Sequence, residues 1–143
     1  ARLLLLGTGP LEQETRALAD RLGVADRVIF AGVRTNVQAF YHAMDAFLLP
    51  SLFEGLPVVL VEAQAAGLPC FVADTIDRGA AFASGVEFLP LEDPEAWADA
   101  LAGASLARNP LAQTQALAAG FDVRTSAEIL QAFYLRRYAE VTR

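Results

Sequence analysis

Short apolar runs recur along the chain, and each ends at glycine, proline or a polar residue. Their lack of apolar–polar alternation is typical of strands that are buried on both faces of a parallel sheet. The first run, Leu3 to Leu6, is closed by Gly7-Thr8-Gly9-Pro10, and the fourth run carries the only cysteine, Cys70. This pattern predicts strands at residues 3–6, 28–31, 46–49, 70–73 and 87–89.

Segments with the apolar spacing of helices separate these strands. Pro10 suits a first helical position, Gly23 a helix end, and Asn36 and Asp93 helix caps. The pattern predicts helices at residues 11–22, 36–44, 57–66, 94–102, 110–119 and 125–138, with an irregular stretch at 74–85. Strands joined by crossover helices indicate one α/β domain, a parallel sheet with helices on both faces.

Ligands of such sheets bind beyond the carboxyl ends of the strands. The segments to examine for a binding site are therefore those that follow a strand. They are residues 7–10, 32–36, 50–57 and 74–79.

Composition narrows the possible functions. The 143 residues suit one domain, and 55% apolar with 20% charged residues excludes intrinsic disorder. The net charge of −6 argues against a nucleic-acid partner, and the absence of lysine excludes lysine-based catalysis. One cysteine and one histidine exclude a disulfide framework and a Cys/His zinc site. We expect Cys70 in the core and His42 on a helix, packed or partly exposed.

The segment from Ser51 to Glu62 is the most informative in the chain. Gly55 permits close approach of the backbone to a ligand, and Pro57 begins a helix whose free N–H groups point back at the loop. Because helix N-termini carry partial positive charge, this arrangement suits a phosphate group. Glu54 lies just ahead of the helix, where a carboxylate fits hydroxyl groups beside the phosphate.

Glu62 is the charged residue of an otherwise apolar helix, Pro57 to Ala66, which we expect to be buried on most sides. A carboxylate there is costly unless it is hydrogen-bonded. At 1.5 Å per residue, it lies about 7.5 Å along the axis from Pro57, which suits a diol such as ribose. The alternative is that Glu62 pairs with an arginine or caps a neighbouring loop.

Two loops near the N-terminus offer further candidates. Gly7-Thr8-Gly9-Pro10 resembles the opening of a dinucleotide fingerprint, but Glu12 stands where a third glycine would fall. The loop is either a phosphate contact or a tight strand-to-helix turn. Arg34 follows the second strand, and it either meets an anion at the sheet edge or is a solvated loop residue.

The sequence EGLPVVLVEAQAAGLPCFVAD resembles the E-x7-E signature of the retaining, nucleotide-sugar-dependent glycosyltransferases of the GT-B architecture, often called group 1. The upstream sequences LLLLGTGPLEQETRALADRLGVADRVIFAGVRTNV and YHAMDAFLLPSLFEGLP follow the same family order. Downstream, VEFLPLEDPEAWADAL is similar to the branch that builds capsular polysaccharides and exopolysaccharides. The similarity extends from Leu3 to about Tyr138 and implies one half of a GT-B fold, with a Rossmann-like sheet.

The resemblance implies a role for each matching residue. Glu54 matches the residue that contacts the sugar hydroxyls and the diphosphate region, and is the expected catalytic residue. Gly55, Leu56 and Pro57 match the loop whose amides hold the phosphates and the transferred sugar, and Glu62 matches the glutamate that binds ribose. The other matches are Val33 and Arg34 in the loop lining the base, and Gly7 and Gly9 in the glycine loop near the diphosphate.

The sequence also departs from the family. The family carries an arginine and a lysine that neutralise the leaving diphosphate, in a position that would precede Ala1. We therefore expect the chain to lack its first strand–helix unit and the N-terminal acceptor domain, and to bind donor without transferring sugar. Residues 74–85 lack the common glycine-glycine-x-x-E pattern, which leaves the contacts of that stretch unassigned.

These points together predict that residues 1–143 are the donor-binding domain of a glycosyltransferase that assembles bacterial surface polysaccharides. The whole enzyme is expected to move a hexose from UDP or GDP to a sugar or lipid-linked acceptor, in the cytoplasm at the inner face of the membrane. Any peripheral membrane association would involve the absent domain. No cofactor or metal is expected, because there is no D-x-D cluster.

Two other functions are possible alternatives to a donor-binding domain. One is a non-catalytic nucleotide-binding or regulatory module. The other is a metabolic enzyme with a Rossmann-like fold, which the incomplete glycine fingerprint disfavours.

Overall fold

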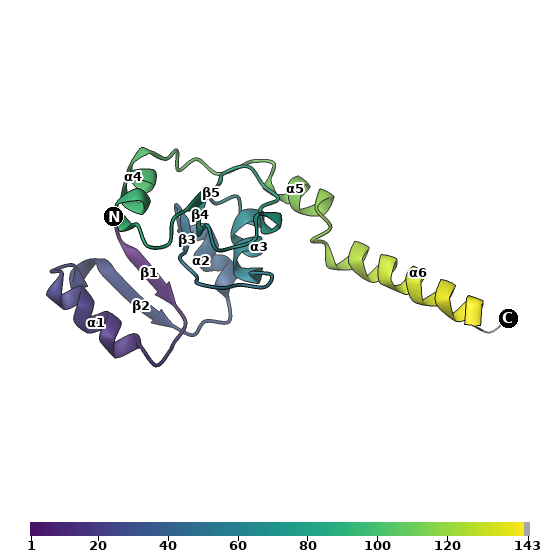
Figure 1. Ribbon diagram of the computed structural model, residues 1–143, viewed down its shortest axis with the longest axis horizontal. Helices are drawn as coiled ribbons and strands as arrows, with labels where there is room; N and C mark the ends of the chain where they lie inside the picture. Colours follow the sequence, from purple (N-terminus) through teal and green to yellow (C-terminus); the bar gives the residue numbers. More distant parts are fainter. Residues whose placement is uncertain (142–143) are drawn as a thin grey trace. The chain divides into compact units, whose positions relative to one another are not determined.

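The computed structural model describes residues 1–141, and their contacts divide the chain into two compact units. The first unit is Ala1–Val37, and the second begins at Gln38. Every strand pairs in parallel, and helices connect the strands (Figure 1). The α/β class predicted from the apolar runs is therefore confirmed.

The first unit is a strand–helix–strand arrangement. Strand β1 (Leu3–Leu6) leads into helix α1 (Glu12–Arg21), a short 3-10 helix η1 (Ala25–Arg27) and strand β2 (Val28–Gly32). All four residues of β1 pair with β2. Parallel strands need a long crossover connection, and α1 supplies it.

The second unit contains a three-stranded parallel sheet in the order β3-β4-β5. The middle strand β4 is buried at all four positions, as its unbroken apolar sequence predicts. From the unit boundary at Val37 onward, the elements are α2 (Val37–Ala43), β3 (Phe47–Leu49), α3 (Val58–Ala65), β4 (Cys70–Ala73), η2 (Arg78–Ala80), β5 (Val86–Leu89), α4 (Pro94–Gly103), α5 (Ala112–Ala118) and α6 (Val123–Val141).

The predicted elements agree closely with the observed ones. Each predicted strand matches within one residue at either end, and each helix within three residues. Asp93 caps α4 as predicted, because its Oδ1 accepts a hydrogen bond from the Ala96 amide at 3.1 Å. Pro10 is a correction, because it lies in a turn and α1 begins two residues later, at Glu12.

The apolar core of the second unit joins the sheet to α4. Phe71, Ala73, Leu89 and Trp97 form one buried cluster. The indole Nε1 of Trp97 donates to the Pro90 carbonyl at 2.8 Å, so the polar atom of this side chain is satisfied. Cys70 is fully buried, which confirms it as a core residue, and burial raises the pKa of its thiol to about 12.

Helix α3 has a buried side and a solvent side. Leu60, Ala63 and Gln64 are buried, whereas Val58 and Val59 on the other side are exposed. Glu62 is also exposed, so the expectation that this helix is buried on most sides was wrong. The exposed side carries valines, so apolar composition alone did not distinguish the two sides.

Gly67 lies just beyond the C-terminal end of α3, after the C-cap Ala66, and has the left-handed conformation, with φ +78°. Its amide donates to the Gln64 carbonyl at 2.9 Å, and the next amide, of Leu68, donates to the Ala63 carbonyl at 3.1 Å. A Cβ added at Gly67 would lie 2.9 Å from the Asn109 carbonyl oxygen. Both the backbone conformation and the available space therefore require glycine here.

Gly67→Ala should lower the free energy of unfolding by about 2 kcal/mol, because alanine adds backbone strain and a close backbone contact. Urea denaturation followed by circular dichroism measures the change. Gly103→Ala is the matched control, because a Cβ there meets open space at ordinary φ. An equal loss of stability in both variants would contradict this account.

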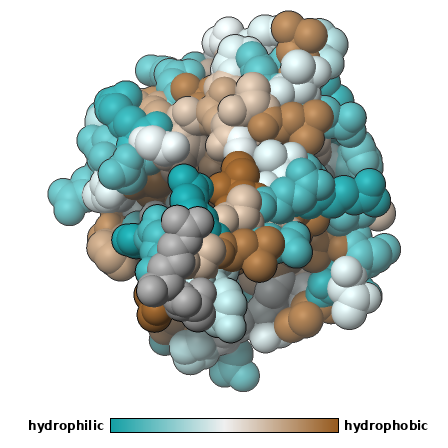
Figure 2. Space-filling model, turned by 90° about the vertical axis from the view of Figure 1, so that its right-hand side faces the viewer, coloured by the Kyte–Doolittle hydropathy of each residue, from teal (hydrophilic) through white to brown (hydrophobic). Residues whose placement is uncertain are grey.

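Helix α6 ends the described chain and has no buried residue among its described positions. It extends away from the rest of the second unit (Figure 1). The side toward which it extends faces the viewer in Figure 2, where hydrophobic and hydrophilic residues are mixed. No helix within residues 1–141 has the length and apolar character needed to cross a membrane.

Candidate functional site

Two of the predicted loops meet at the carboxyl edge of the three-stranded sheet. The loop of residues 50–57 follows β3, and the loop that begins at Asp74 follows β4. The Thr75 hydroxyl donates to the Ser51 carbonyl at 2.7 Å and joins them. This contact confirms that parallel strands bring these two segments to one edge.

Glu54 is half-buried within the first of these loops. Its Oε1 accepts a hydrogen bond from the Ser51 hydroxyl at 2.9 Å. No other hydrogen bond to this carboxylate is found within residues 1–141, so one oxygen is left for a ligand. Ser51 was not singled out in the sequence, although a serine three residues before a loop glutamate is close enough to bond it.

The N-terminal end of α3 follows Gly55 and Leu56, both of which are exposed. Pro57 caps the helix without a side-chain hydrogen bond, and its carbonyl accepts from the Leu60 and Val61 amides at 2.9 and 3.2 Å. In the described part of the chain, the Val58 and Val59 amides have no acceptor. Free amides at a helix N-terminus can hold an anion such as phosphate.

Glu62 accepts a hydrogen bond at Oε2 from the Tyr41 hydroxyl, at 3.0 Å. Its partner is thus a tyrosine of α2, rather than the arginine or loop considered from sequence. Tyr41 is only 3% exposed, and its hydroxyl also lies 3.3 Å from the Val59 carbonyl oxygen. Burial and the adjacent carboxylate raise the pKa of Tyr41 well above its ordinary value, which keeps the hydroxyl protonated as a donor.

Arg108 ties together the C-terminal ends of α2 and α3. Its guanidinium donates to four backbone carbonyls, where helix ends leave acceptors unsatisfied. A cationic donor also complements the negative end of a helix dipole. The acceptors are the carbonyl oxygens of Ala66 at 2.8 Å, Tyr41 at 2.9 Å, His42 at 3.0 Å and Met44 at 2.6 Å.

Gln64, like Ser51, is a residue whose importance was not predicted from the sequence. It is 1% exposed, and its amide nitrogen donates to the Leu60 and Ala80 carbonyls at 3.2 and 2.9 Å. Its Oε1 accepts from the Phe82 and Ala83 amides at 2.9 and 3.1 Å. This one side chain therefore holds α3 against residues 80–83.

The remaining predicted residues lie in the first unit. The Gly7 amide donates to the Gly32 carbonyl at 2.9 Å, so the loops after β1 and β2 leave the same edge. The Gly9 carbonyl accepts from the Glu12 amide at 3.1 Å, as expected of a tight strand-to-helix turn. Val33 is 72% exposed and Arg34 is also exposed, in the loop after β2. A phosphate contact by the glycine loop stays a prediction.

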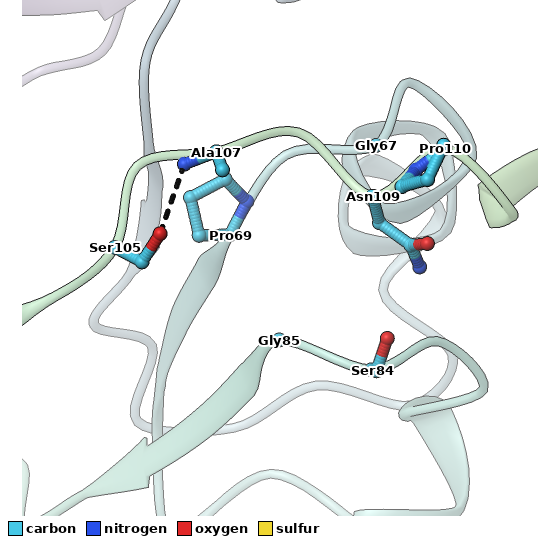
Figure 3. Close-up of a pocket in the computed structure, with 8 residues that line it drawn as sticks. All are labelled: Gly67, Pro69, Ser84, Gly85, Ser105, Ala107, Asn109 and Pro110. Carbon is cyan, nitrogen blue, oxygen red and sulfur yellow. Dashed lines mark hydrogen bonds between the residues drawn. The ribbon is translucent and has the colours of Figure 1, made fainter.

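A cavity of about 300 Å³ lies at the opposite edge of the three-stranded sheet (Figure 3). Pro69 and Gly85, which immediately precede β4 and β5, form part of its wall. None of the predicted site residues lines it. The full lining is Gly67, Pro69, Ser84, Gly85, Ser105, Ala107, Asn109 and Pro110. Within residues 1–141, no three histidine, cysteine or acidic side chains lie together in a way that could hold a metal ion.

Comparison with known proteins identifies the family. Residues 1–105 match the family described as glycosyl transferases group 1. EpsF of Bacillus subtilis (strain 168), named as a glycosyltransferase, is 40% identical over 111 residues, which cover 76% of this chain and 29% of EpsF. The Vi polysaccharide biosynthesis protein VipC/TviE of Salmonella typhi is 35% identical over 94 residues, which cover 66% of this chain and 16% of that protein.

The fold is similar to part of a solved structure, sucrose-phosphate synthase from Thermosynechococcus elongatus, with a TM-score of 0.81 at 22% identity. That match covers 97% of this chain and 39% of the synthase. The chain thus spans well under half the length of each of these three proteins.

Proposed function

The chain belongs to the group 1 glycosyl transferases, and on this premise we propose that it binds the nucleoside-diphosphate sugar donor of a retaining enzyme. The observation that carries the proposal is the segment of residues 51–62. There a helix N-terminus with free amides lies between two glutamates in the sequence. Because the family is one of transferases, a non-catalytic nucleotide-binding module is not favoured.

The two glutamates share an arrangement that suits the binding of hydroxyl groups. Glu54 is held at Oε1 by Ser51, and Glu62 is held at Oε2 by Tyr41. Each carboxylate keeps its second oxygen for a ligand, since no further hydrogen bond to either is found within residues 1–141. Charge-assisted hydrogen bonds from sugar hydroxyls to these oxygens are stronger than neutral ones. We assign the transferred sugar to Glu54 and the ribose to Glu62.

The diphosphate is assigned to the backbone amides at the start of α3. Gly55, Leu56 and Pro57 form the loop along which the diphosphate would reach these amides. Amides fixed at a helix N-terminus stabilise the charge that develops on a leaving diphosphate without reorganising. For the first unit, taken by itself, the roles follow from the family resemblance alone: we propose Val33 and Arg34 for the base and Gly7 and Gly9 for the diphosphate. This assignment requires no metal, so donor binding should persist in EDTA.

We further propose that the transferred group is a hexose, carried on UDP or GDP, and that the acceptor is a sugar or a lipid-linked sugar of a surface polysaccharide. The name of VipC/TviE, a polysaccharide biosynthesis protein, supports this class of product. Acceptor binding is assigned to a further, N-terminal domain of the whole enzyme, and the reaction to the cytoplasmic side of the membrane. The 143-residue chain alone should then bind donor without transferring sugar.

Calorimetric titration of the chain with UDP, GDP and ADP, and with UDP-glucose and GDP-mannose, tests the proposal. Glu62→Ala should weaken nucleotide binding by about 10- to 100-fold, the value of a charge-assisted hydrogen bond. Glu54→Ala should weaken binding of the nucleotide sugar more than binding of the nucleotide. Glu128→Ala, at an exposed glutamate of α6, is the control and should leave both affinities unchanged.

Two results would contradict the proposal. In the first, none of the three nucleotides or the two nucleotide sugars binds the folded chain. In the second, Glu54→Ala and Glu62→Ala both bind as tightly as the unaltered chain. If Glu62→Ala abolishes nucleotide binding while Glu54→Ala leaves nucleotide-sugar affinity unchanged, a nucleotide-binding module replaces the donor-binding assignment.

A further inference from the structure

We infer that Tyr41 is a positioning residue for donor binding, which holds the carboxylate of Glu62 in the orientation that meets the ribose. This inference rests on the proposed ribose role of Glu62. The two side chains come from different elements, α2 and α3, and are 21 positions apart in the sequence. Their hydroxyl and carboxylate oxygens are 3.0 Å apart, a normal hydrogen-bond distance.

The glutamate needs such a restraint because it is exposed. A long exposed side chain samples several rotamers, and fixing it on binding costs conformational entropy. The Tyr41 hydroxyl bonds one carboxylate oxygen, Oε2, and so turns the other oxygen to a defined place before the ligand arrives. The restraint therefore acts on ribose binding through Glu62, without contact between Tyr41 and the ligand.

Tyr41 is itself fixed, as a positioning residue must be. It is 3% exposed, and its ring packs edge-on against Phe47 at the start of β3, with 6.0 Å between ring centroids. Its backbone carbonyl accepts from Arg108 at 2.9 Å. The ring is thus held by the sheet and the backbone by the guanidinium, so the hydroxyl has little freedom to leave Glu62.

Removal of the hydroxyl should leave the fold intact. The Val59 carbonyl, its other acceptor, lies within α3 and keeps the helical hydrogen bond to the amide four residues later. The Glu62 carboxylate is exposed and can be solvated by water. Tyr41→Phe keeps the packing against Phe47, and hence it separates the positioning role from the structural one.

The test compares UDP and GDP with their 2′,3′-dideoxy counterparts by calorimetry on the folded chain. Tyr41→Phe should weaken binding of the ribonucleotide by about 5- to 10-fold, which corresponds to one hydrogen bond. Binding of the dideoxy nucleotide should change less than about twofold, because it lacks the hydroxyls that Glu62 meets. Tyr134→Phe, at an exposed tyrosine of α6, is the matched control and should change neither affinity.

A double-mutant cycle completes the design. In a Glu62→Ala background, Tyr41→Phe should have no further effect on ribonucleotide binding, because the residue acts through Glu62. Equal losses for both nucleotides, as a misfolded variant would give, overturn the inference, and so does an additive effect in the double variant. If Glu62→Ala alone leaves ribonucleotide binding unchanged, the ribose assignment in the proposed function fails, and the inference fails with it. If Glu62→Ala weakens binding and Tyr41→Phe does not, the inference alone is overturned.

Discussion

Gln64→Leu should lower the free energy of unfolding by about 3 kcal/mol, because it leaves buried backbone groups without partners. The leucine would fill a similar volume, so the loss would come mainly from hydrogen bonds and little from packing. The Ala80 carbonyl would lose its donor, and the Phe82 and Ala83 amides would lose their shared acceptor. The Leu60 carbonyl lies within α3 and keeps its helical bond.

Urea denaturation followed by circular dichroism measures this change. Gln113→Leu on α5 is the control, because that glutamine is exposed and its replacement should change stability by less than about 0.5 kcal/mol. A loss below about 1 kcal/mol in Gln64→Leu would mean that water replaces the side chain, and that Gln64 does not hold residues 80–83.

Trp97→Ala should lower the free energy of unfolding by about 4 kcal/mol, the usual cost of deleting a large aromatic side chain from a core. Trp97 is 8% exposed and packs with Phe71, Ala73 and Leu89, so its removal leaves a cavity between α4 and the sheet. The Pro90 carbonyl also loses the indole donor. Trp97 is the only tryptophan, so circular dichroism rather than tryptophan fluorescence must follow unfolding.

Trp97→Phe separates packing from hydrogen bonding at this position. It retains an aromatic ring without the N–H donor and should cost about 2 kcal/mol, roughly half the alanine effect. If the phenylalanine and alanine variants are equally unstable, the indole hydrogen bond would outweigh the packing, contrary to this account.

The strands and helices could be predicted closely because their signals are local. The buried strand β4 appears as an unbroken apolar run, and the end of α3 is marked by a glycine. The same local reasoning failed for the exposure of Glu62. Val58 and Val59 are apolar on the solvent side of α3, so the apolar pattern did not show which side faces the core.

The contacts that support the candidate site could not be predicted, because their partners are distant in sequence. Tyr41 meets Glu62 across 21 positions, and Arg108 meets the end of α2 across 64 to 67 positions. Contacts between residues so far apart in sequence are determined by the tertiary fold. The local spacing of residues along the chain does not predict them. Sequence could name both glutamates as candidates, whereas the hydroxyl groups that orient them are evident only in the folded chain.

Arg108 also bears on the order in which the second unit can be completed during synthesis. Its acceptors lie 42 to 67 positions earlier in the chain, so α2 and α3 emerge from the ribosome well before the guanidinium that joins their ends. A fragment that stops at residue 105, where the family match ends, contains every predicted site residue and lacks this arginine. Such a fragment would keep the side chains proposed to bind the donor. It would lack the Arg108 hydrogen bonds that join the end of α2, which carries Tyr41, to the end of α3, which carries Glu62.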